Sequence, residues 1–294
     1  MQTKNQKSVS LILGGGGARG LAHIGIIRWL EENNYKIQSI SGCSIGALIG
    51  GIYAAGKLDD FEQWVCAITK VDMVTLLDIS WGTSGFVKGD KIINTLIELV
   101  GDQDIETLPI RFTAVASDLK GEKEVWINSG KLFDAIRASI SLPFFFTPFR
   151  RNGVELIDGG VLNPVPIAPT FSDGTDMSIA VNLGGDVEHA LIEKSVTDTP
   201  QNDPPQLHDK ILNFINRFKE PNNGEGQSEW NILEIAHQAF DAMQGTIARQ
   251  KLAAYPPDHT ITIPRNICTI LEFDRAAEMI ELGYQRAKQQ LGEG

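Results

Sequence analysis

The stretch Ser41-Gly42-Cys43-Ser44-Ile45-Gly46 has the pattern Gly-x-Ser-x-Gly and lies between a predicted strand and a predicted helix. Upstream, residues 35–40 alternate between apolar and polar, which is typical of a short strand. Downstream, glycine and alanine recur at helical spacings, so the helix can lie very close to a sheet. A strand, a sharp turn and a helix form the context of a nucleophile elbow, where the serine hydroxyl stands clear of the backbone. Gly42 and Gly46 keep side chains out of that turn, and Ser44 is the candidate nucleophile.

A second glycine-rich turn precedes the first along the chain. The mostly apolar residues 9–13 predict a strand, which runs into Gly14-Gly15-Gly16-Gly17-Ala18-Arg19-Gly20 and then into a predicted helix over residues 21–32. Two consecutive units of strand, glycine turn and helix predict an α/β fold with a mostly parallel central sheet covered by helices.

The rest of the chain predicts one domain over residues 8–294. Residues 186–229 interrupt it, because residues 197–205 and 220–229 are rich in Pro, Asn, Gly, Asp and Gln, a composition typical of loops. Within this irregular polar excursion, residues 207–218 have one apolar side, and we expect either a surface helix or a lid over a cleft.

Charge and composition exclude several classes of protein. The 26 basic and 37 acidic side chains give a net charge of −11, which argues against nucleic-acid binding and against long-range attraction to anionic lipid. Residues 1–8 lack the apolar region of a signal peptide, and the apolar run 45–55 is too short to span a bilayer. The three cysteines are widely spaced, which favours reduced thiols and no metal site. We expect a cytoplasmic protein, with transient peripheral membrane contact as a further expectation.

The first glycine turn is a candidate oxyanion loop. Gly15, Gly16 and Gly17 would present backbone N–H groups at a helix amino terminus, where negative charge is favoured. The same loop matches the dinucleotide pattern Gly-x-Gly-x-x-Gly, but residues 39–41 lack the acidic ribose ligand expected about twenty residues on. A phosphate-binding P-loop would need a following Gly-Lys-Ser/Thr, which is absent.

The base that would activate Ser44 is less clear from the residues alone. None of the histidines lies in an obvious strand-end loop; they are His23, His189, His208, His237 and His259. Asp158 ends a predicted strand and is followed by Gly159 and Gly160, and in a poorly solvated site it could accept the serine proton. An aspartate before two glycines is also a common turn, so the residues leave the base open.

Together, the glycine loop, the elbow and Asp158-Gly159-Gly160, in this order, resemble the three signatures of the patatin-like phospholipases. Residues 135–143 (Ala-Ile-Arg-Ala-Ser-Ile-Ser-Leu-Pro) resemble a further block of that family, and residues 273–284 are similar to bacterial members. The resemblance implies a three-layer α/β/α fold and a Ser44–Asp158 dyad without histidine. It also implies an oxyanion loop formed by Gly15, Gly16 and Gly17 with Arg19 nearby.

We therefore expect a serine lipid acyl hydrolase of the phospholipase A or lysophospholipase type, which needs no metal or cofactor. Its substrate would be a phospholipid or another lipid ester. The aromatic residues 144–146 and Phe149 are expected in the core or in the wall of an acyl-chain cleft. Two alternatives stay open: a histidine-dependent esterase of the α/β-hydrolase type, and a non-catalytic module that binds a nucleotide or lipid.

Overall fold

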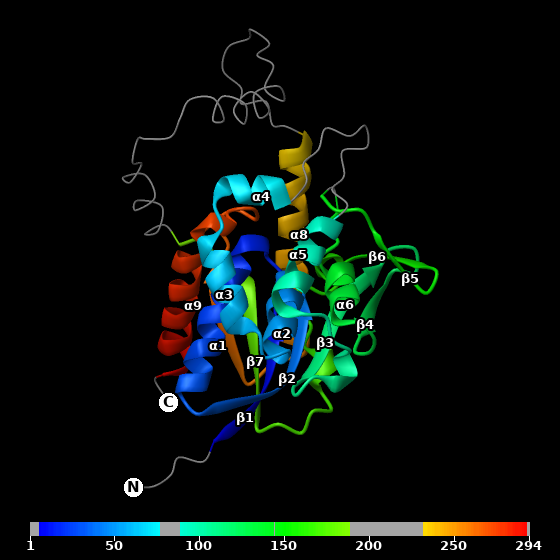
Figure 1. The fold of residues 1–294 in the computed structure, drawn as a ribbon. Helices are drawn as coiled ribbons and strands as arrows, with labels where there is room; N and C mark the ends of the chain where they lie inside the picture. The colour runs from blue at the N-terminus through cyan, green and yellow to red at the C-terminus, as the bar shows by residue number, and fades with distance from the viewer. Residues whose placement is uncertain (1–5, 77–88, 144, 189–231, 293–294) are drawn as a thin grey trace, which may run out of the picture. The chain divides into compact units, whose positions relative to one another are not determined.

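The computed structural model describes residues 6–76, 89–143, 145–188 and 232–292 (Figure 1). The strands are β1 (Lys7–Leu13), β2 (Tyr35–Cys43), β3 (Arg111–Asp118), β4 (Lys123–Ile127), β5 (Phe149–Arg151), β6 (Val154–Asp158), β7 (Met177–Gly185) and β8 (His259–Pro264). The helices include α1 (Ala22–Glu32), α2 (Ile45–Ala54), α3 (Leu58–Ala67), α4 (Lys70–Leu76), α5 (Asp90–Val100), α6 (Leu132–Ser139), α8 (Ile232–Ala254) and α9 (Ala276–Leu291). Short 3₁₀ helices are η1 (Gly17–Leu21), η2 (Ile105–Thr107), η3 (Gly159–Val161), η4 (Ala168–Thr170) and η6 (Phe273–Arg275).

By its internal contacts the chain divides into two compact units, residues 1–187 with 244–294, and residues 188–243. The first unit contains every described strand. The expected excursion 186–229, with its amphipathic segment 207–218, lies almost wholly outside the described residues, so a single domain with a lid stays a prediction. Among the described helices, none combines the length and the apolar character needed to cross a membrane.

The sheet has a parallel centre and an antiparallel side. Its strand order is β5-β6-β3-β2-β1-β7-β8, with β4 also paired to β3. Five consecutive strands are parallel to one another: β3, β2, β1, β7 and β8. Strands β4 and β6 pair antiparallel with β3, and β5 pairs antiparallel with β6. Leu13 of β1 is in register with Gly42 of β2, so the glycine loop and the elbow begin side by side at the carboxyl edge. The expected α/β fold with a mostly parallel sheet is confirmed.

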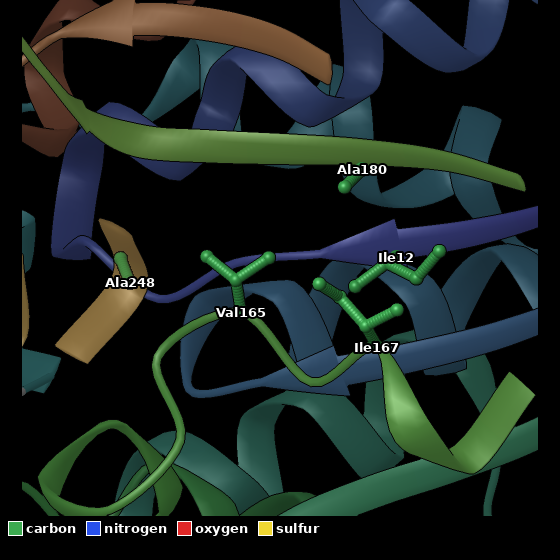
Figure 2. Packing of buried hydrophobic residues seen from close by; sticks show 5 residues of the cluster. All are labelled: Ile12, Val165, Ile167, Ala180 and Ala248. Atoms are coloured by element: carbon green, nitrogen blue, oxygen red, sulfur yellow. The ribbon is translucent and has the colours of Figure 1, made fainter. Parts of the chain in front are cut away.

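Both faces of the central strands are covered. Ile12 and Leu13 point to opposite faces of β1, and both side chains are fully buried. On the face of Leu13 lies α2, whose Gly50 allows close contact with that side chain. On the other face, a loop and α8 complete a cluster made of Ile12, Val165, Ile167, Ala180 and Ala248 (Figure 2). Strands enclosed on both sides explain why residues 11–13 are continuously apolar.

Helices α1 and α9 lie side by side at one flank of the sheet (Figure 1). Their contact depends on two glycines. A side chain at Gly25 would collide with the carbonyl oxygen of Ile280, and one at Gly283 would collide with the carbonyl oxygen of Ala22. The two backbones therefore approach as closely as only glycine permits.

Replacing Gly283 by alanine is expected to lower the free energy of unfolding by about 1–3 kcal/mol, because the added methyl group forces the two helices apart. Thermal unfolding followed by circular dichroism would show a lower Tm. Gly245→Ala in α8 is the matched control, since among the described residues its Cβ would meet only Arg249 Nη1, at 3.5 Å. That change should be neutral or stabilising by up to about 1 kcal/mol. An unchanged Tm for Gly283→Ala would contradict this account of the helix contact.

Candidate active site

Ser44 occupies a strained turn between β2 and α2. Its backbone has φ 55° and ψ −125°, a conformation that side-chain-bearing residues rarely adopt. A Cβ at Gly42 would lie 2.5 Å from the carbonyl oxygen of Gly46, and a Cβ at Gly46 would collide with the carbonyl oxygen of Leu13. The two motif glycines thus let the turn close against β1, and the elbow expected from the sequence has the geometry of a nucleophile elbow.

Asp158 reaches this elbow because two strands follow one another along the same edge of β3. Cys43, the last residue of β2, pairs with Val115, and Asp158, the last residue of β6, pairs with the adjacent Ala116. Strand β4 pairs with the same part of β3 and must occupy its other edge. Strand β6 therefore pairs with the same edge of β3 as β2, directly beyond the end of β2. The last residues of β2 and β6 lie next to each other. The Cys43 Sγ lies 3.8 Å from Asp158 Oδ1.

The Asp158 carboxyl group is fully buried. Its Oδ1 accepts a hydrogen bond of 2.7 Å from the Gly160 N–H. Its Oδ2 has no hydrogen-bond partner of regular geometry among the described residues. Burial raises the pKa of Asp158 to about 6, while hydrogen bonding to the Ser44 side chain, the Gly160 N–H and the Cys43 thiol opposes the rise. The group is a stronger base than an ordinary aspartate, and it is still mostly ionised at neutral pH.

The remaining motif glycines allow the chain to pass close to β3 and α8. A Cβ at Gly159 would collide with the carbonyl oxygen of Val115, and one at Gly160 would collide with the Gln244 side chain. Gly159 and Gly160 are therefore required because neither position has room for a side chain, and not only because the chain turns there.

The glycine loop lies against the elbow but differs from the expectation at one position. The Gly15 N–H donates to the carbonyl oxygen of Pro164 at 3.0 Å, so it is not free to bind an oxyanion. The N–H groups of Gly16 and Gly17 make no hydrogen bond to any described residue. Gly15 has a steric role instead, because a Cβ added at this position would lie 3.3 Å from the Ser44 Cβ. A bare backbone at this position leaves space beside the nucleophile.

Arg19 is buried and supports the loop from behind. Its Nε donates to the carbonyl oxygen of Gly16 at 3.1 Å, and its Nη1 donates to that of Arg265 at 2.8 Å. The guanidinium thus ties the expected oxyanion loop to the segment after β8. Sequence reasoning placed Arg19 in the loop without this role, because Arg265 is 246 residues away.

Neither of the two histidines whose side chains the structure describes is placed to act as a base for Ser44. His23 is fully buried, its Nε2 lies 2.9 Å from the Gly14 carbonyl oxygen, and burial lowers its pKa to about 4. His259 begins β8 and therefore lies at the amino edge of the sheet, opposite the elbow. His189, His208 and the side chain of His237 lie outside the described residues.

Two supporting groups were not recognised from the sequence. Ser139 donates to the Val115 carbonyl oxygen at 2.6 Å and accepts from the Ser44 N–H at 2.9 Å. Asn163 donates to Glu124 at 2.7 Å and precedes Pro164, whose carbonyl receives the Gly15 N–H. The only sequence signal for Ser139 was its place in the block 135–143.

Phe145, Phe146 and Phe149 are half-buried, and Phe144 is outside the described residues. The rings of Phe145 and Phe146 meet edge to face, with centroids 4.8 Å apart. Their partial exposure makes them neither fully buried core nor free surface, and a part in an acyl-chain cleft stays a prediction.

Comparison with known proteins identifies the relatives of this chain. Residues 11–171 match the family model of the patatin-like phospholipases. The chain is 36% identical to an uncharacterised NTE family protein of Mycobacterium tuberculosis, over 96% of this chain and 91% of that protein. It is 28% identical to lysophospholipase NTE1 of Pyricularia oryzae, over 95% of this chain but only 18% of that protein. Among solved structures, VipD from Legionella pneumophila is similar with a TM-score of 0.47 and 15% identity, covering 98% of this chain and 67% of VipD.

The chain belongs to the patatin-like phospholipase family. The resemblance stated from the three motifs is confirmed, and membership places the chain among the lipid acyl hydrolases.

Proposed function

We propose that this protein cleaves the carboxylic ester bond of a phospholipid or lysophospholipid with a catalytic dyad of Ser44 and Asp158. The observation that carries the proposal is the meeting of β2 and β6 along one edge of β3, which places a buried carboxyl group with a raised pKa beside a strained serine. The histidine-dependent alternative is less well supported, because His23 is bonded to Gly14 and His259 lies at the opposite edge.

The reaction takes place in two halves. The Ser44 Oγ attacks the ester carbonyl carbon while Asp158 accepts the hydroxyl proton. The carbonyl oxygen becomes an oxyanion, which the N–H groups of Gly16 and Gly17 stabilise. As the carbonyl re-forms, the bond to the alcohol oxygen breaks and Asp158 returns its proton to the leaving alcohol. Asp158 then takes a proton from water, whose oxygen attacks the acyl-serine, and Ser44 leaves with that proton as the fatty acid is released.

The names of the relatives and the half-buried aromatic side chains near the site support this substrate class. The fungal relatives are named as lysophospholipases, which supports a lysophospholipid as substrate, although this chain spans only 18% of such a protein. The half-buried Phe145 and Phe146 rings lie just beyond α6, the helix that carries Ser139. An acyl chain bound against these rings would gain free energy with each methylene that leaves water.

Fluorophosphonate labelling combined with a lipid panel tests the proposal. The folded protein is expected to form a covalent adduct mapped to Ser44 by mass spectrometry, and to release fatty acid from lysophosphatidylcholine or phosphatidylcholine. Alanine at each of His189, His208, His237 and His259 should leave the rate within about twofold of wild type. His23→Gln keeps a donor near the Gly14 carbonyl and should still be labelled.

Failure of the folded protein to react would favour the non-catalytic binding module. A histidine variant that keeps the wild-type Tm but loses turnover would support the histidine-dependent esterase instead.

A further inference from the structure

We propose that Ser139 is a positioning residue that holds the nucleophile elbow in register with the base. The inference rests on the dyad proposed above, and it goes beyond the dyad because it assigns a role to a side chain that does not touch the substrate. Ser139 is the last residue of α6 and is fully buried. Its hydroxyl donates to the Val115 carbonyl oxygen at 2.6 Å, which leaves its lone pairs to accept the Ser44 N–H at 2.9 Å.

The Ser139 hydroxyl joins two backbone groups, the Ser44 N–H and the Val115 carbonyl, at the end of the hydrogen-bond ladder between β2 and β3. Pairing of β2 with β3 stops at Cys43 and Val115, because the chain turns away at Ser44. The Ser44 N–H and the Val115 carbonyl would otherwise lie unpaired in a buried site, which folded proteins rarely tolerate. Gly159 passes closely over the Val115 carbonyl but offers no side chain. The Ser139 hydroxyl therefore takes the place of the next rung between the two strands.

The same short segment also holds the base. The Asp158 N–H donates to the carbonyl oxygen of Ser141 at 2.9 Å, two residues after Ser139. The Ser141 hydroxyl is fixed in turn by the buried Arg137, whose Nη1 donates to it at 2.7 Å. One rigid turn at the end of α6 thus receives a backbone N–H from each member of the dyad.

This arrangement predicts which kinetic constant depends on Ser139. Without its hydroxyl, the elbow loses the contact that fixes it relative to β3 and the turn after α6. The Ser44 Oγ would then spend less time within reach of Asp158, and small displacements of reacting groups are costly for rate. Substrate binding should change little, because Ser139 has no exposed surface.

The experiment compares kcat, KM and the rate of fluorophosphonate labelling in four proteins: wild type, Ser139→Ala, Ser139→Thr and Ser10→Ala. Ser139→Ala is expected to lower kcat and the labelling rate by about 10- to 100-fold with KM within about twofold. Ser139→Thr keeps the hydroxyl and should recover most of the rate. Ser10 is the matched control: it is equally buried and bonded to Asp173 and Thr175, but it lies in β1 away from the carboxyl edge, so its alanine variant should keep wild-type rates.

A folded Ser139→Ala protein with the wild-type labelling rate would overturn the inference, and so would a Thr variant as slow as Ala at unchanged Tm. If the Ala variant does not fold, Ser139→Cys preserves the volume with a much weaker acceptor, and it should fold and react slowly. A Cys variant with wild-type rates would also overturn the inference. Absence of labelling in wild type would instead remove the proposed dyad, and this role of Ser139 would fall with it.

Discussion

Ser44→Ala is expected to reduce lipid ester hydrolysis by about 10⁴-fold or more, because no other described hydroxyl occupies the elbow and the reaction loses its covalent step. Initial rates of fatty acid release from lysophosphatidylcholine vesicles would measure the loss. The oxyanion donors at Gly16 and Gly17 remain in place, so slow residual turnover above the uncatalysed rate is compatible with the mechanism.

Stability separates loss of the nucleophile from loss of the fold. Alanine keeps the Cβ and therefore the strain at φ 55°, so the Tm of Ser44→Ala should be close to that of wild type. Ser44→Gly removes the strain and should raise the free energy of unfolding by about 1 kcal/mol, while being equally inactive. Retention of substantial hydrolysis in either variant would exclude Ser44 as the nucleophile.

The parts of the site that the sequence predicted are those decided by neighbouring residues. A strand, a glycine turn and a helix are all encoded within about fifteen residues, so the elbow at Ser44 and the loop at Gly14 could be recognised directly. The repetition of this unit also predicted the parallel sheet, since two such units leave few other topologies. The place of Asp158 after a strand was visible for the same reason.

The parts that the sequence missed depend on pairing between distant segments. Strand β6 pairs with β3 directly beyond the residues that pair with β2, and this arrangement depends on the register of the strands. The residues near Asp158 in the sequence contain no signal that predicts it. The Gly15 N–H could not be excluded as an oxyanion donor without knowing that Pro164 lies opposite it. In the sequence, Ser139 looks like an ordinary residue at the end of a helix. Its hydroxyl has a role because it bridges the Ser44 N–H and the Val115 carbonyl oxygen, which do not bond to each other directly.

Asp158→Asn is expected to lower kcat by a factor comparable with that of Ser44→Ala. The amide can still accept the Gly160 N–H through its oxygen, so the geometry of the turn is kept. It cannot accept a proton at the position of Oδ2, and the serine hydroxyl then has no base. Rates of hydrolysis and of fluorophosphonate labelling should both fall, and a labelling rate equal to wild type would remove Asp158 from the mechanism.

The pH dependence of the wild-type enzyme should follow the same carboxyl group. The base is active when ionised, and the pKa of Asp158 is about 6. Consequently kcat/KM should rise with pH, about tenfold per unit below this value, and reach a plateau above it. His23, with its pKa near 4, cannot produce an inflection at this pH. A profile without an inflection near pH 6 would show that ionisation of Asp158 does not control the rate.

Stability should change with pH in the opposite direction. Asp158 binds its proton more tightly in the folded protein, with a pKa of about 6 against an ordinary value of 3.8. Between these values the native state holds more protons than the unfolded state, so the free energy of unfolding falls as pH rises through about 6. A shift of about two units corresponds to a cost of up to about 3 kcal/mol at neutral pH.

Asp158→Asn removes this cost because an amide does not ionise. Urea unfolding at pH 8 should show the inactive variant to be more stable than wild type, and near pH 4 the advantage should largely disappear. An advantage that stays constant between the two pH values would mean that the buried charge is not its source. If the difference closes as expected, the burial that makes Asp158 a useful base is also what destabilises the folded enzyme at the pH where that base works.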